Sequence, residues 1–310
     1  MKDQKMKAII CTAYGAPEVL KIREVEKPVP KDNEVLIKII ATAVTSADIR
    51  IRGLKVDGIL RLIMPFVLGF NKPRKPILGI VLSGKVTEIG KNVKTFKRDD
   101  EVFASTGLKF GAYAQYIALP EKSNIAHKPN NASFEEAAAI LFGGMSALYF
   151  LEKAGIASER AKKILIYGAT GSVGSAAIEI AKHYKASVTS VCSEQGVELA
   201  KKLGSDSVIV YTQQDFTKLD TTYDIIFDAV GKIKRKDCSK LLNQGGTYIT
   251  VGGMDVAKET TAQMEFLKTL YENEELNANI DSVYTMNEIV EAHRYVDTGR
   301  KKSNVVVKIA

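Results

Sequence analysis

The chain has 310 residues, of which 45% are hydrophobic and 26% are charged, as in ordinary globular proteins with one large or two medium-sized domains. Its three cysteines, Cys11, Cys192 and Cys238, are widely spaced, which excludes a disulfide scaffold and favours the reducing cytoplasm. The longest uncharged run, Ala137–Leu151, has 15 residues, whereas a membrane-spanning helix needs about 20. The apolar run Ala8–Ile10 is too short for a signal peptide. We therefore expect a soluble cytoplasmic protein.

The chain carries 44 basic and 36 acidic residues, a net charge of +8. Such an excess suits nucleic acid or a phosphorylated small molecule as the partner. The basic residues are scattered, however, with small clusters at Lys232–Lys236 and Arg300–Lys302, and neither tryptophan nor a nucleic-acid-binding signature accompanies them. We therefore predict a solvated basic surface and a small-molecule substrate, with no nucleic acid and no membrane as partner.

The first 130 residues or so predict short β-strands separated by turn signals, as in a barrel-like or sandwich-like domain. These strands are expected at Lys7–Ala13, Val19–Glu26, Glu34–Val44, Ile77–Ile89, Glu101–Ala104 and Tyr113–Leu119. The apolar segment Ile59–Phe70 is broken by Arg61 and Pro65, so it is either a loop over a pocket or part of the core.

From Ser133 onward the pattern changes to alternating strands and helices, which is typical of a doubly wound parallel sheet. Ser133 and Glu136 form a capping-box sequence before an alanine-rich helix, and a second helix, Ser146–Ala154, is expected after Gly143 and Gly144. The strands of the sheet are expected at Lys163–Tyr167, Ser187–Cys192, Val208–Val210, Tyr223–Phe227 and Thr247–Val251. The later helices are expected at Val173–Tyr184, Val197–Leu203, Ile233–Leu242, Ala262–Glu275 and Met286–Thr298, before a last strand at Asn304–Ile309.

The sharpest feature is the glycine-rich turn Gly168–Gly174, which joins an expected strand to an expected helix. Glycines at 168, 171 and 174 suit a tight turn, the close approach of a pyrophosphate to the backbone, and tight packing of the helix on the strand. The helix N-terminus offers N–H groups to the phosphates. Since strand, turn, helix and next strand follow in the order that this motif requires, the sequence predicts a dinucleotide-binding site.

With this turn and other motifs along nearly the whole chain, the sequence resembles the zinc-independent medium-chain dehydrogenases/reductases of the quinone oxidoreductase (zeta-crystallin-like) branch. The matching residues are Met6–Ala8, Gly79, Gly84, Gly90, Asp100–Phe103, Gly111–Tyr116, Gly168–Gly174, Phe227–Gly231 and Ala292–Arg294. The resemblance implies an α/β fold, in which a Rossmann doubly wound parallel sheet is inserted into a β-rich GroES-like catalytic domain. The expected domains are 1–129 for the first part of the catalytic domain, 130–275 for the dinucleotide-binding domain and 276–310 for the return to the catalytic domain.

Zinc-using relatives carry a cysteine three residues before an aspartate, and a Gly-His-Glu sequence further on. The matching positions here hold Thr45, before Asp48, and Gly79–Val81, and no cysteine between Cys11 and Cys192 supplies the four-cysteine lobe of those relatives. Thr, Ile and Val offer zinc no thiolate, imidazole or carboxylate. We therefore expect no metal site.

Without a metal, the Lewis acid that an alcohol dehydrogenase uses to activate an alkoxide is missing. A quinone or an α,β-unsaturated carbonyl accepts hydride from a reduced nicotinamide directly, and hydroxyl groups, backbone N–H groups or water can stabilise its oxyanion. The resemblance implies an active-site edge at Val44–Arg50. Our catalytic candidates are Thr45 and Asp48, and our candidate substrate contacts are Thr45, Ser46 and Arg50. Many quinone reductases have Asn and Tyr in place of Thr45 and Arg50, and Thr45 and Ser46 could instead only cap the next helix.

Further cofactor contacts follow from the resemblance. Ser146 stands where the family has a hydroxyl residue, and Val230–Gly231 and Val251–Gly252 end consecutive strands, where the family packs the nicotinamide and its ribose. The same valines and glycines could instead serve only in the core. The candidate cofactor contacts are Ser146, Gly168, Ala169, Thr170, Gly171, Ser172, Val173, Gly174, Cys192, Ser193, Gln195, Tyr211, Val230, Gly231, Val251 and Gly252.

The expected cofactor is NADPH, with NADH as the weaker alternative. An NAD-preferring Rossmann site usually ends its second strand with an acid that binds the ribose 2′-hydroxyl and repels a 2′-phosphate. Here that strand ends in Cys192 and Ser193, which are neutral, and Tyr211 after the third strand could flank the phosphate. Glu194 follows, and Gln195 stands near where relatives often have a basic residue, so we expect moderate selectivity.

The sequence therefore predicts an NAD(P)H-dependent oxidoreductase that transfers hydride to a quinone or an α,β-unsaturated carbonyl without zinc. One alternative is an NAD(P)-dependent alcohol dehydrogenase, or an aldehyde or ketone reductase. An alternative of another class is a non-catalytic, nucleotide-dependent sensor or RNA-binding protein. The intact glycines and the dispersed basic residues favour the enzyme.

The family follows the strand that matches Thr247–Val251 with a crossover helix and a sixth strand, at which two subunits often join their sheets. Here only 12 residues, Gly252–Gln263, precede the next helix, too few for a crossover and a strand. We therefore expect the sheet to end at Thr247–Val251, with the charged segment Met254–Thr261 over its edge. The protein is then a monomer, or a dimer that does not use edge-strand pairing.

Overall fold

The computed structural model describes residues 4–54, 66, 68–158, 160, 162–253 and 255–310, which divide into two compact units. The outer unit comprises residues up to 141 together with residues 280–310, and the inserted unit comprises residues 142–279. One boundary falls inside helix α3, Phe134–Lys153, and the other directly precedes strand β13, Ile280–Thr285. The sequence analysis drew the boundaries after residues 129 and 275.

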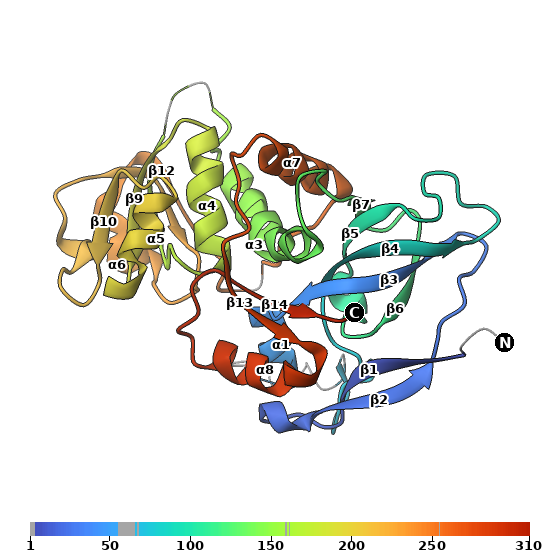
Figure 1. Cartoon of the computed structure of the whole chain (residues 1–310). Coiled ribbons are helices and arrows are strands. Elements are labelled where there is room, and N and C mark those ends of the chain that lie inside the picture. The colour runs from blue at the N-terminus through green and yellow to red at the C-terminus, as the bar shows by residue number, and fades with distance from the viewer. Residues whose placement is uncertain (1–3, 55–65, 67, 159, 161, 254) are drawn as a thin grey trace. The chain divides into compact units, whose positions relative to one another are not determined.

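The outer unit is built on a seven-stranded sheet in the order β13-β14-β3-β4-β5-β7, with β6 also paired to β3 (Figure 1). Its strands, besides β13, are β14 (Asn304–Lys308), β3 (Glu34–Ala43), β4 (Val81–Ile89), β5 (Glu101–Ser105), β6 (Tyr116–Pro120) and β7 (Ile125–His127). Strands β1 (Lys5–Cys11) and β2 (Leu20–Glu26) form a separate antiparallel pair. The predicted β-rich first domain is therefore confirmed, and its final strand comes from the other end of the chain.

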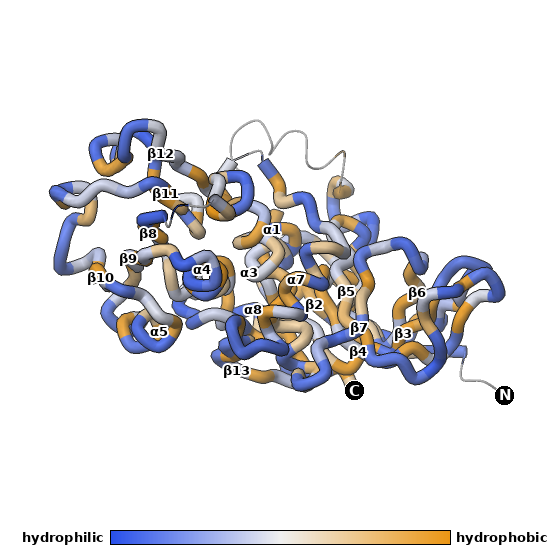
Figure 2. Tube along the Cα trace, turned by 90° about the horizontal axis from the view of Figure 1, so that it is seen from above, coloured by the Kyte–Doolittle hydropathy of each residue, from blue (hydrophilic) through white to orange (hydrophobic). Residues whose placement is uncertain are grey.

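The core of the outer unit follows from side-chain periodicity. Val35, Ile37 and Ile39 recur at every second residue of β3, so they point to one face, where they join a buried hydrophobic cluster. Helix α8, Ile289–Asp297, adds Ile289 and Val296 to the same cluster, because residues seven apart lie on one face of a helix. Figure 2 shows the hydrophobic residues concentrated along the elements and the hydrophilic ones in the loops.

The inserted unit contains a five-stranded parallel sheet in the order β10-β9-β8-β11-β12, with helices α4 and α5 packed on it (Figure 1). The strands are β8 (Lys163–Tyr167), β9 (Ser187–Cys192), β10 (Ser207–Val210), β11 (Tyr223–Asp228) and β12 (Leu242–Thr250). The helices are α4 (Ser172–His183), α5 (Val197–Lys202), α6 (Arg235–Cys238) and α7 (Thr261–Glu272). The doubly wound parallel sheet is confirmed, and its strand order reverses between β8 and β11, where such sheets bind ligands.

The prediction of a separate helix at Ser146–Ala154 is wrong, because α3 runs unbroken through Gly143 and Gly144. Both glycines are needed for packing: a Cβ on Gly143 would lie 2.2 Å from the carbonyl oxygen of Ser172, and one on Gly144 would lie 2.8 Å from Cδ1 of Leu267. Helix α3 is long and apolar enough to cross a membrane, but 72% of its apolar window is buried inside the protein, as in the core helix of a soluble protein. At its start, the predicted capping box of Ser133 and Glu136 is confirmed.

The expected helix Ile233–Leu242 is confirmed in part: α6 and a short 3-10 helix, Ser239–Leu241, form there, and β12 already begins at Leu242. The pairing of β12 with β11 shifts register beyond Leu242 and resumes at Thr247, so the extra residues are absorbed in an irregular stretch that contains Gly245 and Gly246. Among the described residues the sheet ends at β12, in agreement with the sequence. Part of the expected covering segment, Met254, lies outside the described residues, as do residues 55–65 and 67, which include most of the segment Ile59–Phe70.

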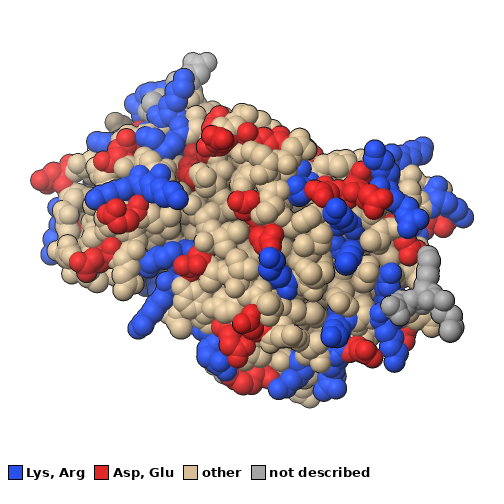
Figure 3. Space-filling model, viewed as in Figure 1, with Lys and Arg blue, Asp and Glu red and all other residues tan. Residues whose placement is uncertain are grey.

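On the face shown in Figure 3, basic and acidic side chains are interspersed, and neither kind forms a continuous patch.

Glu179 of α4 is an acidic residue that is buried inside the inserted unit. Its carboxylate accepts hydrogen bonds from the side-chain amide of Asn277 at 2.7 Å and from that of Asn279 at 3.3 Å. Burial nevertheless raises the pKa of Glu179 to about 7, so this acid is only partly ionised at neutral pH.

We predict that Glu179→Gln makes the protein's stability less dependent on pH. The folded-state pKa of Glu179 lies above its ordinary value of 4.5, so the stability that this group contributes is complete below pH 4.5 and lost as the pH rises through about 7. The loss in the wild type amounts to about 3 kcal/mol. Thermal unfolding at pH 5 and pH 8 should show a smaller difference for Glu179→Gln, whereas the exposed control Glu198→Gln should behave like the wild type. Equal pH dependence in all three proteins would contradict the prediction.

Candidate active site

The predicted phosphate turn lies between β8 and α4 in the inserted unit. Gly168 has a φ of +75°, and a Cβ there would lie 1.9 Å from Cγ2 of Val230, so only glycine fits. A Cβ on Gly174 would lie 2.2 Å from the carbonyl oxygen of Gly168, which is why α4 can pack so closely on the turn. At Gly171 the nearest atom to an added Cβ is 3.7 Å away, so the backbone is approachable there.

Gly171 is also the N-cap of α4, and it has no side chain with which to cap the helix. The positive end of the helix dipole and the first N–H groups of Ser172 and its neighbours therefore suit a phosphate. The open backbone at Gly171 and the absence of a Cβ at all three glycines fit a dinucleotide pyrophosphate. Thr170 packs behind the turn, since a Cβ on Gly196 would lie 2.6 Å from its hydroxyl oxygen.

The end of β9 brings three other candidate cofactor residues together. Cys192 is buried, Ser193 is half-buried, and the N–H group of Tyr211 donates to the carbonyl oxygen of Cys192 at 3.1 Å. The Tyr211 side chain is 48% exposed, and Gln195 is exposed on the loop that follows. These four residues, which the sequence predicts beside a 2′-phosphate, are therefore all uncharged, and none of them offers a basic side chain to it.

A residue that sequence reasoning missed as part of the site is Asp228, which is fully buried at the end of β11. Its carboxylate accepts from the N–H groups of Val230, Gly231 and Ile233 at 3.1, 2.8 and 3.1 Å, and from the hydroxyl of Thr250 at 3.1 Å. One side chain thus shapes the loop that carries two of the predicted cofactor contacts. The sequence could have indicated Asp228 by its position, because it is the last residue of a strand and precedes a turn that contains glycine.

The loops after β11 and β12 meet through two glycines. Gly231 has a φ of +78°, and a Cβ there would lie 2.7 Å from Cα of Gly252. Val251 donates its N–H to the carbonyl oxygen of Asp228 at 3.0 Å. The structure therefore brings together the predicted pairs Val230–Gly231 and Val251–Gly252. Ser146 lies on α3, where it is 8% exposed.

In the outer unit, Thr45 and Asp48 form a capping box at the start of α1, Ser46–Arg52. The N–H and the hydroxyl of Thr45 donate to the Asp48 carboxylate at 2.9 and 2.7 Å, and the N–H of Asp48 donates back to the Thr45 hydroxyl at 3.2 Å. The N–H of Gly79 donates to the other carboxylate oxygen at 3.1 Å. Thr45 is 3% exposed and Asp48 is 0% exposed, so both groups are committed to each other and not to solvent.

Behind Asp48 lies a second set of buried polar groups. The Tyr113 hydroxyl lies 3.1 Å from Nε2 of His293, and both side chains are 0% exposed. Arg52 is 0% exposed and donates to Asp297 at 2.5 Å. Burial raises the pKa of Asp48 to about 6, and burial with the nearby Arg52 lowers that of His293 to about 3. Sequence reasoning missed this set, except for Asp48.

Two predicted substrate contacts keep their side chains accessible on α1. Ser46 is partly exposed and Arg50 is exposed. The structure does not describe residues 55–65 and 67, so the two interpretations of the segment Ile59–Phe70, a loop over a pocket or part of the core, lie largely outside the described residues. Among the residues that the structure describes, no group of three His, Cys, Asp or Glu side chains is arranged to hold a metal ion.

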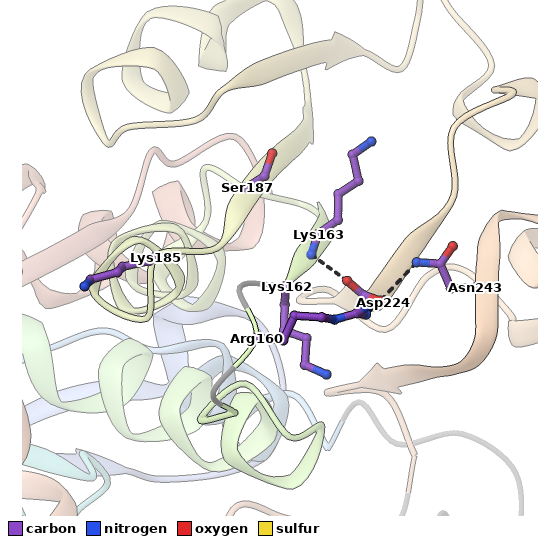
Figure 4. Close-up of a pocket in the computed structure, with 7 residues that line it drawn as sticks. All are labelled: Arg160, Lys162, Lys163, Lys185, Ser187, Asp224 and Asn243. Atoms are coloured by element: carbon purple, nitrogen blue, oxygen red, sulfur yellow. Dashed lines mark hydrogen bonds and ion pairs between the residues drawn. The ribbon is translucent and has the colours of Figure 1, made fainter.

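A hollow of about 360 Å³ opens at the amino-terminal edge of the parallel sheet, opposite the phosphate turn (Figure 4). Asp224 lies within it, where Arg160 and Asn243 contact its carboxylate at 2.5 and 3.0 Å. Figure 4 shows that Lys163 and Lys185 point away from this carboxylate in different directions. The hollow therefore does not converge on a single anion, and it contains none of the predicted cofactor residues.

Comparisons with known proteins agree with this architecture. Residues 31–130 match the family described as "Alcohol dehydrogenase GroES-like domain", and residues 172–289 match "Zinc-binding dehydrogenase". The quinone oxidoreductase from Coxiella burnetii has the same fold, with a TM-score of 0.84 over 99% of this chain and 100% of its own, at 24% identity. The α/β architecture of a Rossmann sheet inserted into a GroES-like domain is thereby confirmed.

Relatives in sequence are oxidoreductases. The 2-methylene-furan-3-one reductase of Solanum lycopersicum is 34% identical over 98% of this chain and 79% of its own. The chloroplastic NADPH-dependent alkenal/one oxidoreductase of Arabidopsis thaliana is 29% identical over 98% and 80%. The quinone oxidoreductase of Homo sapiens is 29% identical over 80% and 73%.

The phosphate turn makes a paired prediction. Gly174→Ala should lower the free energy of unfolding by about 2 kcal/mol, because its Cβ meets three backbone atoms of Gly168 and Ala169 that cannot move independently. Gly171→Ala should keep the wild-type stability but weaken NADPH binding by about tenfold or more, because its Cβ occupies only the space through which a pyrophosphate approaches. Thermal unfolding and fluorescence titration with NADPH measure the two effects. Tight NADPH binding by Gly171→Ala would show that no phosphate lies there.

Proposed function

Because the chain belongs to the medium-chain dehydrogenase/reductase family, in its quinone oxidoreductase branch, we propose that it reduces a quinone or an α,β-unsaturated carbonyl with NADPH. The observation that carries the proposal is the glycine turn. A ligand can approach its backbone at Gly171, whereas at Gly168 and Gly174 other atoms of the protein already fill the space that a Cβ would need. The names of the relatives support the acceptor class, since alkenals and quinones are both conjugated carbonyl compounds.

NADPH, when bound, supplies the hydride. The turn at Gly171 and the start of α4 bind the pyrophosphate. Asp228 holds the loop of Val230 and Gly231 in shape, and the contact of Gly231 with Gly252 keeps the next loop beside it. These buried contacts give the two loops a fixed shape, and the loops would hold the nicotinamide end of the cofactor.

In the outer unit we assign Thr45 and Asp48 to positioning. The Thr45 hydroxyl donates its proton to Asp48, so it has none to give to a substrate oxygen. Asp48 is fully buried and acts through Thr45 and Gly79. Of the predicted substrate contacts, the Ser46 hydroxyl and the Arg50 guanidinium remain accessible to a substrate.

The enzyme is proposed to work without zinc. Thr45, Ile80 and Val81 stand at the positions of the metal ligands in zinc-using relatives, and none of these side chains is a zinc ligand. A conjugated acceptor also needs no Lewis acid to take up hydride.

The test follows NADPH by absorbance: its oxidation in the presence of a quinone, an enal or an alkanal, and its formation from NADP⁺ in the presence of an alkanol. We expect turnover with the first two, unchanged activity after treatment with a chelator, and no stoichiometric zinc by elemental analysis. Turnover confined to the alkanal or alkanol would favour an alcohol dehydrogenase. NADPH binding without turnover of any of them would favour a nucleotide-dependent sensor.

We propose a moderate preference for NADPH over NADH, which Cys192→Asp should lower. The end of β9 is neutral, with Ser193 and Tyr211 beside it, and a carboxylate there would bind the ribose 2′-hydroxyl and repel a 2′-phosphate. The ratio of kcat/KM for NADPH and NADH should fall about tenfold in Cys192→Asp and stay unchanged in the matched control Cys192→Ser. An equal ratio in the wild type and the Asp variant would contradict this assignment.

A monomer, or a dimer through a surface other than the sheet edge, is the assembly that we propose. Strand β12 ends the described part of the sheet, and Asp255 in the segment after it accepts from the Tyr149 hydroxyl at 3.2 Å, so a charged segment folds back on the unit. Light scattering should report the mass of one chain or of two chains. If it reports two, a crystal structure of the dimer should show that β12 does not pair with the partner's sheet. A continuous sheet that crosses a two-fold axis beside β12 would refute the proposal.

We also propose that the enzyme is soluble and works in the cytoplasm. All three cysteines are free and buried, which suits a reducing compartment. Fractionation of cells would test the location.

A further inference from the structure

Three large hydrophobic side chains of the outer unit are exposed on two neighbouring segments. Leu108, in the turn after β5, is 70% exposed, and Phe66 and Phe70 are 65% and 60% exposed. The two phenylalanine rings contact each other edge to face, with their centroids 5.0 Å apart. The Lys75 ammonium, which follows Phe70 in the same segment, donates to the carbonyl oxygen of Leu108 at 3.3 Å. We call Phe66, Phe70 and Leu108 the apolar rim.

The loop that carries Leu108 has a strained backbone. Phe110 has a φ of +56° and a ψ of −160°, a combination that residues with a side chain rarely adopt, although its ring is buried. Gly107 and Gly111 on either side also have positive φ values, +50° and +102°. Strain of this kind persists only where the surrounding structure imposes it, and it is concentrated at ligand-binding sites. The fold therefore holds Leu108 in its exposed position at a cost in free energy.

The Leu108 loop is joined to the start of α1 through Gly79. The carbonyl oxygen of Gly79 accepts from the Thr106 hydroxyl at 3.3 Å and from the N–H of Ala112 at 3.2 Å, so the two ends of the loop meet at this residue. The N–H of Gly79 donates to Asp48 at 3.1 Å. The Leu108 loop and the capping box of α1 therefore share one anchoring residue.

The segment that carries Phe70 is joined to the other end of α1. The carbonyl oxygen of Arg52, the last residue of α1, accepts from the N–H of Gly15 at 3.0 Å. Tyr14, directly before Gly15, donates its hydroxyl to the carbonyl oxygen of Gly69 at 3.0 Å. Since Gly69 directly precedes Phe70, the two parts of the apolar rim are connected to α1 at opposite ends.

Helix α1 has a buried face and an accessible face. Asp48 and Arg52 lie about one turn apart and are fully buried, on the face that contacts α8 (Figure 1). Ser46 and Arg50 also lie about one turn apart, and they are about 200° around the helix from the first pair. Both of them are accessible. The predicted substrate contacts thus face away from α8, and the loops at both ends of their helix carry the apolar rim.

The surroundings of the apolar rim are basic. Four exposed basic residues stand in the same two segments: Lys72, Arg74, Lys75 and Lys109. Neither residues 66–75 nor residues 106–112 include an acid. Among the described residues, none of the four basic side chains has an ion-pair partner. An exposed apolar surface bordered by cations suits an amphiphile, in which an apolar chain is attached to an anionic group.

We propose that the apolar rim and its basic border bind one part of the electron acceptor, and that this acceptor is an amphiphilic anion: a conjugated carbonyl compound with an apolar chain and a carboxylate or phosphate group. The proposal rests on the reductase function, whose acceptor it specifies. The apolar chain would cover side chains that otherwise remain in contact with water. Connection of the rim to both ends of α1 favours the substrate as its occupant over a membrane or a second copy of the chain.

The first test varies the length of the acceptor's chain. For the wild type, kcat/KM should be about tenfold or more higher for 2-nonenal than for 2-pentenal, because each buried methylene adds up to about fourfold. Leu108→Ser and Phe70→Ser should each lower this ratio about threefold. Val29→Ser, which removes an aliphatic side chain that is 82% exposed elsewhere in the outer unit, should keep it. Turnover with equal kcat/KM for both acceptors would overturn the proposal and leave the reductase function standing.

The second test varies the charge of the acceptor. A 2-nonenal that carries a carboxylate on its last carbon should have a kcat/KM about threefold higher than its methyl ester. Added salt should lower this ratio, because exposed charges are screened. Lys109→Gln should bring the ratio close to one, whereas the control Lys21→Gln, on the exposed side of β2, should keep it. A wild-type ratio of one or below would refute the anionic group and with it the proposal.

Binding without turnover separates this proposal from the reductase function. 1-Nonanol has no carbonyl group to reduce, so saturation-transfer NMR in the presence of NADPH reports its binding alone. We expect 1-nonanol to bind the wild type and to bind Leu108→Ser more weakly. That result in a protein that reduces no acceptor would refute the reductase function and retain the rim as a site for amphiphiles.

The other occupants have distinct signatures. Sedimentation with vesicles of phosphatidylcholine and phosphatidylglycerol, if lost in Leu108→Ser, would assign the apolar rim to an anionic membrane. A dimer in light scattering that dissociates in Leu108→Ser would assign it to a second copy of the chain. We expect neither, and either result would overturn the proposal.

Discussion

In both units the candidate site is organised by a fully buried aspartate at a point where the chain leaves a sheet. Buried N–H groups in irregular backbone must find acceptors, and an ionised carboxylate can accept several hydrogen bonds at once. Asp228 binds three N–H groups and the Thr250 hydroxyl, and Asp48 binds the N–H groups of Thr45 and Gly79 together with the Thr45 hydroxyl. The desolvation of a charged group is expensive and is offset only when its oxygens are surrounded by donors. Loss of either aspartate would therefore release several backbone groups together.

Sequence reasoning succeeded where the cause of a structure lies in neighbouring residues. The capping box of Ser133 and Glu136 and the turn Gly168–Gly174 are local, and each has a mechanism that residue type and spacing disclose. It failed at Gly143 and Gly144, which normally weaken a helix. There the absence of a side chain is needed by Ser172 and Leu267, which are distant in sequence, and tertiary packing outweighs local propensity.

The same distinction separates the predicted half of the site from the missed half. Thr45 and Asp48 are three residues apart, so the sequence could reveal them as a pair. The pairs Val230–Gly231 and Val251–Gly252, which follow two consecutive strands, could be found in the same way. Tyr113 and His293 are 180 residues apart, and no periodicity relates them. Arginine and histidine are usually exposed, so nothing in the composition around Arg52 or His293 indicates that both are fully buried.

The two candidate sites consequently tolerate change in different ways. The phosphate turn consists of backbone, so a side chain added at Gly168 or Gly174 would clash with the protein, and one at Gly171 would occupy the space in front of the turn. The start of α1 is held by the buried Asp48, which accepts hydrogen bonds from Thr45 and Gly79. Ser46 and Arg50 are accessible and make none of these hydrogen bonds. Substitutions at these two accessible positions would therefore leave the hydrogen bonds of Asp48 undisturbed. At Arg50, where many quinone reductases have Tyr, this explains in physical terms how the chain can differ and retain the fold that supports the edge.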